Sequence, residues 1–333
     1  MQFLSDNAAA VHPAVWRAMQ AADEADAPYD GDALSSRMDE AFSALFGQPC
    51  VSLWVSSGTA ANGLALAALV PPHGAVVCHG EAHIETSEAG APAFYTHGAK
   101  LILAEGEGAK LTPQAVAAVI DPIEQGVHYV QPSAISLTQA SEYGLSYSGQ
   151  EVAALGAFAQ QRGLSLHIDG ARFANAVAFR GCSPAALSCE AGASTLVFGC
   201  VKNGGMGAEA LVLFDPELAD LVKVCRKRAG HLQSKGRYMA AQVLALVEGD
   251  LWLDNARAAN AAAQEIAGAA GERLLHAVEA NEIFLRLAPQ ERAALRGQGF
   301  GFYDWGDDAA RIVTAWNSDA VDVGKLARAI GGL

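Results

Sequence analysis

The sequence is poor in charge, in proline and above all in lysine. Only 17% of its 333 residues are charged, against 51% that are hydrophobic, and it has 12 prolines and seven lysines. This composition excludes a disordered or fibrous chain and predicts a large buried core, with length for one large domain and a smaller one. The net charge of −14 argues against nucleic acid and anionic membrane surfaces as partners, because both bind basic patches.

Long apolar runs and metal-like cysteine spacings are also missing. The longest apolar stretch, 60–72, is interrupted by Asn62 and Gly63 and is too short to cross a bilayer. Residues 1–7 have no basic segment and reach Asp6 before any apolar run, unlike a signal peptide. The six cysteines form no C-x-x-C pair. We therefore expect a cytoplasmic protein with reduced, structural thiols and no metal site.

Short apolar segments alternate with helical patterns over the first 214 residues. Strands are predicted at 51–55, 75–78, 100–104, 127–130, 164–168, 195–198 and 210–214. Helical stretches lie between them, at 60–69, 112–120 and 149–161. This alternation predicts an α/β fold with a largely parallel sheet covered on both faces.

After Pro216 the pattern becomes mainly helical. Helices are predicted at 217–228, 239–247, 253–269 and 321–330, with short strands at 283–287 and 311–315. We therefore predict a large domain over residues 1–249, including the N-terminal segment, and a small α+β domain over residues 250–333.

Ser57, Gly58 and Thr59 follow the first predicted strand and begin a predicted helix. The first N–H groups of a helix lack partners and its dipole is positive there, so this turn suits an anion. Gly58 would let a phosphate approach the backbone, and Thr59 would add a hydroxyl. The alternative is a capped helix without a ligand, because Ser and Thr are common N-caps.

The segment His167–Arg172 ends an apolar strand on an acid. In α/β proteins, ligand sites form at the carboxyl ends of parallel strands. Asp169 is suited to hold a protonated heterocyclic nitrogen, and Arg172 to reach a phenolate-like oxygen or a carboxylate. The alternative is a local ion pair between Asp169 and Arg172.

Lys202 is the one lysine that follows an apolar strand and precedes paired glycines, Gly204 and Gly205. A lysine removed from water at such a position can act as an amine nucleophile. The alternative is an exposed loop lysine. His83 lies in a polar stretch; an imidazole there can stack on an aromatic ring or act as a base near neutral pH, or have no role at all.

Together these features match the requirements of a pyridoxal 5′-phosphate (PLP) site. Such a site needs a phosphate-binding turn, an acid that keeps the pyridine nitrogen protonated, and a lysine that holds the cofactor as a Schiff base. The turn at Gly58, Asp169 and Lys202 supply these groups in order along one α/β chain. Their order and spacing resemble the aspartate aminotransferase-like fold of PLP enzymes, fold type I.

The sequence resembles the low-specificity L-threonine aldolases nearly from end to end. The segments that carry the likeness are 5–7, 57–62, His83, 167–172, 198–204, 227–231, Ser234-Lys235 and 311–316. The resemblance implies PLP-dependent cleavage of L-threonine, L-allo-threonine or related β-hydroxy-α-amino acids, such as phenylserine, to glycine and an aldehyde.

The resemblance also implies how the cofactor is held. Lys202 forms the Schiff base, Asp169 pairs with the ring nitrogen, and the turn 57–59 binds the phosphate. It implies a homotetramer, a dimer of dimers with PLP sites at the dimer interface, in which Arg228 or Lys235 completes a neighbour's phosphate site.

For the substrate, the resemblance implies that Ser5, Arg172 and Arg311 bind the amino-acid carboxylate. His83 would stack on the cofactor ring and assist proton transfer.

Three positions depart from the family pattern. Val201 stands where threonine is common, Cys200 replaces a usual glycine, and residues 140–143 lack a histidine that many members carry. The base at the β-hydroxyl and the threo/erythro preference therefore stay open. Other functions also stay open, because proteins of one fold can catalyse different reactions. They are β-elimination, racemisation or transamination on the same fold, a PLP-binding protein with little catalysis, and an α/β protein without PLP.

Overall fold

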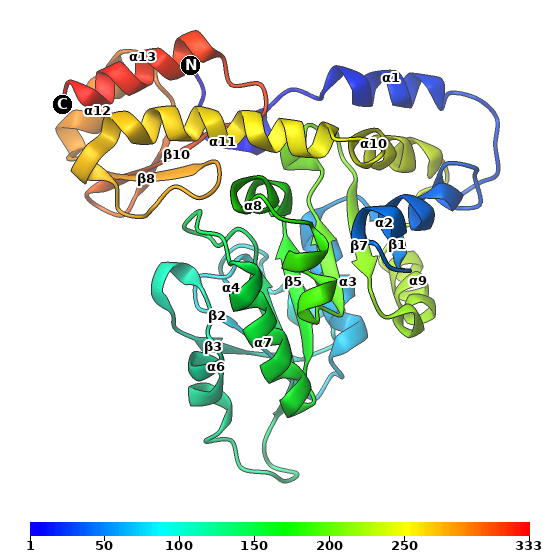
Figure 1. The fold of residues 1–333 in the computed structure, drawn as a ribbon. Coiled ribbons are helices and arrows are strands. Elements are labelled where there is room, and N and C mark those ends of the chain that lie inside the picture. Colours follow the sequence, from blue (N-terminus) through cyan, green and yellow to red (C-terminus); the bar gives the residue numbers. More distant parts are fainter.

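A seven-stranded sheet forms the centre of the larger part of the molecule in the computed structural model, which describes residues 1–333 (Figure 1). Its strands are β1 (Val51–Val55), β2 (Gly74–His79), β3 (Lys100–Ala104), β4 (Gln131–Thr138), β5 (Ser165–Gly170), β6 (Thr195–Phe198) and β7 (Glu209–Leu213). They are ordered β1-β7-β6-β5-β4-β2-β3, and only β7 runs antiparallel to its neighbours. The carboxyl ends of the other six strands therefore meet at one edge.

The predicted strands are confirmed to within two residues, with one exception. The segment 127–130 is wrong as a strand: it precedes β4, and Val127 is 97% exposed. β4 itself carries Gln131, Ser133 and Ser136 among its apolar residues, so its apolar pattern is broken.

Thirteen helices surround the two sheets. They are α1 (Pro13–Ala21), α2 (Met38–Phe46), α3 (Gly58–Leu69), α4 (His83–Thr86), α5 (Ala91–Tyr95), α6 (Pro113–Ile120), α7 (Gly149–Arg162), α8 (Phe173–Arg180), α9 (Ala219–Arg228), α10 (Arg237–Val247), α11 (Leu251–Ala270), α12 (Pro289–Gly297) and α13 (Ala320–Gly331). The predicted helices are confirmed to within two residues, while α1, α2, α4, α5, α8 and α12 were not predicted. Local capping explains several starts: Thr112 caps α6, and Ser148 and Glu151 form a capping box on α7.

Helices cover both faces of the large sheet, as predicted. Alternate residues of β6 enter different cores: Leu196 and Phe198 pack with α2, α7, α8 and α10, whereas Val197 packs with α3 and α9. This division follows from the two-residue period of a strand. In Figure 1, α7 and α8 lie in front of the sheet and α3 behind it.

The smaller part is an antiparallel sheet ordered β8-β10-β9, covered by α12, α13 and one end of α11. The strands are β8 (Glu282–Arg286), β9 (Tyr303–Trp305) and β10 (Ala309–Val313). Phe3 joins this second core, and its backbone bonds Gly301 at 2.8 Å and Val313 at 2.9 Å. The chain around Phe3 thus packs on the smaller part, whereas α1 packs on α10 of the larger part. The division at residue 249 stays a prediction.

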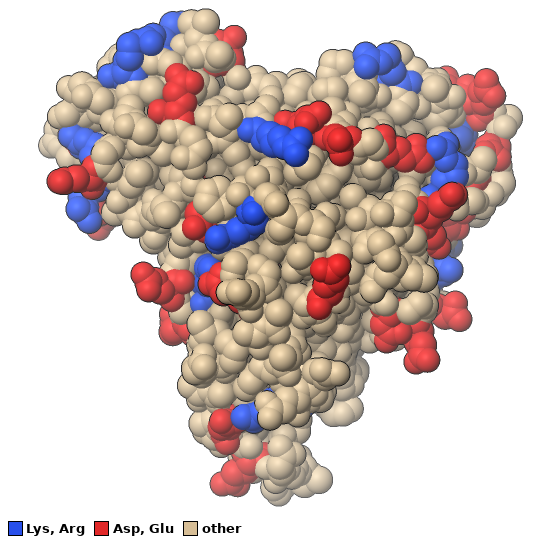
Figure 2. Space-filling model, in the orientation of Figure 1, with Lys and Arg blue, Asp and Glu red and all other residues tan.

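The surface carries mixed charge. Figure 2 shows basic and acidic side chains interspersed, with no continuous basic area on the face in view. None of the helices combines the length and the apolar character needed to span a membrane.

Candidate active site

A cavity of about 450 Å³ lies at the carboxyl edge of the large sheet, bounded on one side by β9 and β10 of the smaller part. This volume falls within the range of roughly 300–1,000 Å³ that is usual for small-molecule sites. Of the residues predicted from sequence, those that line it are Ser5, Gly58, Thr59, His83, Asp169, Arg172, Lys202 and Arg311. Chain segments from both ends of the sequence, such as Ser5 and Arg311, therefore meet at one site.

The N-terminus of α3 opens toward this cavity. Ser57 caps the helix, because its hydroxyl accepts from the N–H of Ala60 at 3.2 Å. The N–H groups of Gly58 and Thr59 have no acceptor in the structure. No atom lies within 4 Å of the place where a Cβ on Gly58 would stand. The turn can thus receive an anion, with Ser57 placed as the cap rather than in the cavity wall.

Asp169 ends β5 and is only 3% exposed. Its Oδ2 accepts from Nδ2 of Asn62 at 2.9 Å, and its Oδ1 accepts from the N–H of Ala171 at 3.1 Å. Arg172 pairs elsewhere, so the alternative of a local Asp169–Arg172 ion pair is wrong. A buried carboxylate held by neutral donors remains available to a cation in the cavity.

Lys202 lies in a short 3-10 helix, Val201–Asn203, directly after β6. Its side chain lines the cavity, is partly buried, and has no hydrogen-bond or ion-pair partner. The alternative of an exposed loop lysine is therefore wrong. Glu209 holds the turn by accepting from the N–H groups of Cys200 and Val201. Burial raises the pKa of Glu209 to about 7.

His83 begins α4 and is anchored by a buried acid. Its Nδ1 lies 2.8 Å from Oε1 of Glu88, whose side chain is fully buried. The hydrogen bond with Glu88 raises the pKa of His83, against the opposing effect of burial. Glu88 also accepts from Asn62 at 2.9 Å, and Asn62 bonds Asp169. One amide thus connects the acid behind His83 to the acid at the end of β5.

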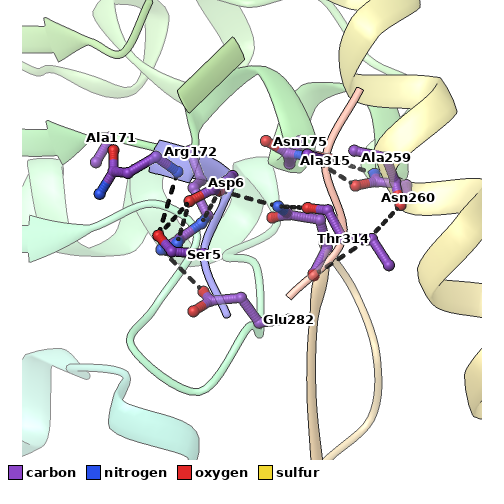
Figure 3. Close-up of polar contacts among 12 residues, drawn as sticks. Ser5, Asp6, Ala171, Arg172, Asn175, Ala259, Asn260, Glu282, Thr314 and Ala315 are labelled. Atoms are coloured by element: carbon purple, nitrogen blue, oxygen red, sulfur yellow. Dashed lines mark hydrogen bonds and ion pairs between the residues drawn. The ribbon is translucent and has the colours of Figure 1, made fainter. Parts of the chain in front are cut away.

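Two arginines and two acids form a network at the opposite end of the site, and Figure 3 shows three of its members, Asp6, Arg172 and Glu282. Nε and Nη2 of Arg172 donate to Asp6 at 2.7 and 2.9 Å, and Nη1 lies 3.1 Å from Oε2 of Glu282. Nε and Nη2 of Arg311 donate to the other oxygen of Glu282 at 3.0 and 2.8 Å. Burial alone would raise the pKa of Asp6, but the charges of Arg172 and Lys202 and the hydrogen bonds from Arg172 and Asn281 together lower it.

Neutral side chains behind this network join the two parts of the molecule. Nδ2 of Asn175 on α8 donates to Asn260 on α11 at 2.9 Å, and Asn260 donates back to the carbonyl of Asn175 at 2.9 Å (Figure 3). The hydroxyl of Thr314, just after β10, donates to the carbonyl of Ala259 at 2.7 Å. These buried, paired groups fix α8 and the end of β10 against α11.

Besides Ser57, two predicted residues lie outside the cavity of this chain. Arg228 ends α9 on the surface, where its Nη1 lies 3.1 Å from Nε2 of His97. Lys235 is exposed and forms a backbone bridge with Tyr29. Their predicted role in a neighbour's site stays a prediction.

Several cavity residues were not predicted as site residues. They are Asn62, Glu88, Glu142, Glu209, Tyr303 and Trp305. Asn62 belongs to the motif 57–62, so its place in that motif was an available signal. Glu142 falls in the segment 140–143, where the family histidine is missing.

The fold and the cavity define a class of protein. Residues 2–289 match the family model described as beta-eliminating lyase. The structure superposes on a threonine aldolase of Leishmania major with a TM-score of 0.92 and 24% identity, covering 99% of this chain and 98% of that one. The class is that of the fold-type-I PLP enzymes, so the predicted fold class is confirmed.

Sequence comparison narrows the class. The chain is 42% identical to the low specificity L-threonine aldolase of Pseudomonas aeruginosa, over 99% of this chain and 96% of that protein. It is 40% identical to that of a Pseudomonas species, over 98% and 96%. The chain belongs to the low-specificity L-threonine aldolase family.

Proposed function

We propose that this protein is a PLP-dependent aldehyde-lyase that cleaves L-threonine, L-allo-threonine or related β-hydroxy-α-amino acids to glycine and an aldehyde. The observation that carries the proposal is one cavity that joins an unpaired lysine, a buried carboxylate, an open helix N-terminus and an arginine pair. The named activity of the Pseudomonas relatives supports the same reaction.

The donor set of the cavity fits PLP. The unpaired amine of Lys202 is the group that would hold the cofactor aldehyde, and the free N–H groups of Gly58 and Thr59 would bind its phosphate. Asp169 would keep a proton on the ring nitrogen. When bound, PLP supplies a protonated pyridine that accepts the electron pair of a broken bond at Cα.

Arg311 is the arginine best placed to take the substrate carboxylate. Its Nη1 has no partner, and its side chain is 23% exposed, toward the cavity that it lines. All three nitrogens of Arg172 already contact Asp6 or Glu282, so Arg172 contributes its remaining N–H groups and positive charge. The hydroxyl of Ser5 is a further donor in the same wall. Binding the carboxylate here would orient the Cα atom of the substrate. This orientation matters because a misplacement of about 1 Å costs on the order of 10²-fold in rate.

We also propose that the chain forms a homotetramer with sites at a dimer interface. Leu221, Val224 and Arg228 lie on one face of α9 by their spacing of three and four residues. Leu221 and Val224 are 50% and 67% exposed. An apolar patch beside a cation supports burial of this face against a second subunit that receives Arg228 or Lys235.

The cysteines support a reducing compartment such as the cytoplasm. All six are free in the structure. Burial raises the pKa of the Cys50 thiol to about 11 and that of Cys78 to about 12, so these thiols are unreactive.

The test is aldehyde release from purified protein given L-threonine, L-allo-threonine or L-phenylserine, with and without added PLP. We expect PLP-dependent acetaldehyde or benzaldehyde in equal amount to glycine. A yellow protein that releases neither aldehyde but forms pyruvate from L-serine would assign the site to β-elimination, the reaction that the matched family model describes.

A further inference from the structure

One enclosed acid of the cavity has no role in the arrangement above. Glu142 lies in the loop after β4 and lines the cavity. Its Oε1 accepts from the backbone N–H of His83 at 3.2 Å, and its Oε2 has no hydrogen-bond partner and is not sealed from the cavity. No arginine, lysine or histidine side chain lies within ion-pair distance of this carboxyl group. Glu142 therefore has one oxygen free for a ligand.

The buried acids beside it are held differently. Glu88 receives both of its hydrogen bonds on Oε1, and its other oxygen has no partner but is buried away from the cavity. Glu209 holds the backbone turn at Cys200 and Val201 through Oε2. Asp169 accepts from Asn62 and from the backbone of Ala171.

The loop around Glu142 is held in place on both sides. The hydroxyl of Ser141 donates to the carbonyl of Gly108 at 2.7 Å, and its N–H donates to the carbonyl of Leu145 at 2.7 Å. The ring of Tyr143 stacks on His276 at 4.6 Å. A side chain between two such anchors can keep its position relative to a substrate.

Glu142 also lies where a β-hydroxyl would fall. It contacts the backbone of His83 on one side, and the charges that face it are Glu282, Asp169, His83 and Arg172. The carboxylate of a substrate bound at Arg311 is one bond from Cα, and Cβ is one bond further. The hydroxyl on Cβ therefore reaches the region between the arginines and the imidazole.

Protonation favours Glu142 over His83 as a base. Burial, with Glu282 and Asp169 nearby, raises the pKa of Glu142 to about 7, so it exchanges a proton readily near neutral pH. The hydrogen bond of His83 Nδ1 with Glu88 at 2.8 Å occupies one ring nitrogen and raises the pKa of His83, whereas Oε2 of Glu142 is free to accept a proton.

We propose that Glu142 is the catalytic base that removes the proton of the substrate β-hydroxyl, a role that rests on the aldolase function proposed above. The O–H bond breaks, its proton moves to Oε2 of Glu142, and its electron pair becomes the second bond of the new carbonyl. The Cα–Cβ bond breaks, the aldehyde leaves, and the bonding pair stays with Cα until a proton adds there to give glycine. Glu142 then returns its proton to water, so one substrate gives one aldehyde and one glycine.

The test compares two reactions of the holoenzyme variant Glu142→Gln. Aldehyde release from L-phenylserine needs the base, whereas exchange of the α-hydrogen of glycine in D₂O, followed by NMR, needs the cofactor and the arginines but involves no β-hydroxyl. We expect kcat for aldehyde release to fall by about 10²–10⁴-fold, the usual contribution of general acid–base catalysis, and glycine exchange to stay within about 3-fold. The matched control is Glu85→Gln on the exposed face of α4, which should leave both reactions unchanged.

The pH profile gives a second readout. A base must be ionised, so wild-type kcat should fall as the pH drops through about 7, the pKa of Glu142. Glu142→Gln should lose this limb, and Glu142→Asp should recover part of the rate with the limb displaced. An active wild type whose Glu142→Gln variant keeps its aldehyde release, or loses both reactions equally, would overturn the role of Glu142 alone. A wild type that exchanges glycine but releases no aldehyde would overturn the proposed function, and this role with it.

Discussion

Glu282 holds Arg311 by two hydrogen bonds to a single carboxylate oxygen, at 3.0 and 2.8 Å, while its other oxygen faces Arg172 at 3.1 Å. A fully buried carboxylate thus lies between two guanidinium groups that line the cavity. The acid fixes both arginines but satisfies neither completely, because Nη1 of Arg311 stays free. The arginine end of the cavity is therefore already arranged before a substrate arrives.

This arrangement predicts the effect of removing Arg311. Arg311→Ala should raise KM for L-threonine by roughly 30-fold, because a charge-assisted hydrogen bond contributes about 2 kcal/mol. The affinity for PLP, measured by fluorescence titration, should change much less. Arg311→Lys should recover part of the affinity for substrate. Equal losses of PLP and substrate affinity would contradict a role in carboxylate binding.

Lys202→Ala should abolish both the visible absorbance of the cofactor-bound protein and aldehyde release. The free energy of unfolding of the apoprotein should change by less than about 1 kcal/mol, because the ammonium of Lys202 makes no contact that would be lost. Lys325→Ala on the exposed face of α13 serves as the control and should keep colour and activity. Turnover retained by Lys202→Ala would exclude this lysine as the cofactor residue.

The buried pair of Arg172 and Asp6 predicts a large effect on stability. Asp6→Asn leaves Arg172 without one of its two acids, and we expect a loss of about 3–5 kcal/mol in urea unfolding. The surface variant Asp322→Asn, which breaks an exposed pair with Lys325, should cost less than about 1 kcal/mol.

The pH dependence of this effect has a definite sign. The folded-state pKa of Asp6 is lowered, so its contribution to stability is present above pH 3.8, its ordinary value, and is lost as the pH falls through the folded-state value. The acid limb of the stability curve should therefore be shallower in Asp6→Asn than in the wild type. Identical acid limbs would show that Asp6 is not ionised in the folded protein.

Glu88→Gln should lower the pKa of His83, because the hydrogen bond to Glu88 is the largest cause of its rise. The ring ¹³C shift of His83, followed by NMR against pH, measures this directly. The stabilisation by the pair is fully present below pH 6.5, the ordinary value, and is lost as the pH rises through the folded-state pKa. The gap in stability between wild type and Glu88→Gln should therefore be wider at pH 5.5 than at pH 9. An unchanged titration of His83 would rule out this anchoring.

Local patterns were sufficient to find the groups that follow strands. Asp169 lies near the carboxyl end of β5, and Gly58, His83 and Lys202 follow the ends of β1, β2 and β6 within a few residues. Parallel strands bring such positions to one sheet edge. The pattern failed at β4, where polar residues interrupt the strand and the apolar segment 127–130 lies in the turn before it. A strand is recognised in the sequence by buried apolar residues, and the first three residues of β4 are only partly buried, so the apolar signal is missing there.

The amino-acid sequence by itself determined most of the strands and the longer helices, and it identified the turn at Gly58, Asp169 and Lys202 as candidate site residues. Only the tertiary structure decided that Arg172 pairs with Asp6, 166 positions away, rather than with nearby Asp169. It likewise decided which acids are bound and which, like Glu142, keep an oxygen free. The physical reason is that local periodicity reports which side of an element is buried, whereas the partner of a buried charge depends on which distant segments pack around it.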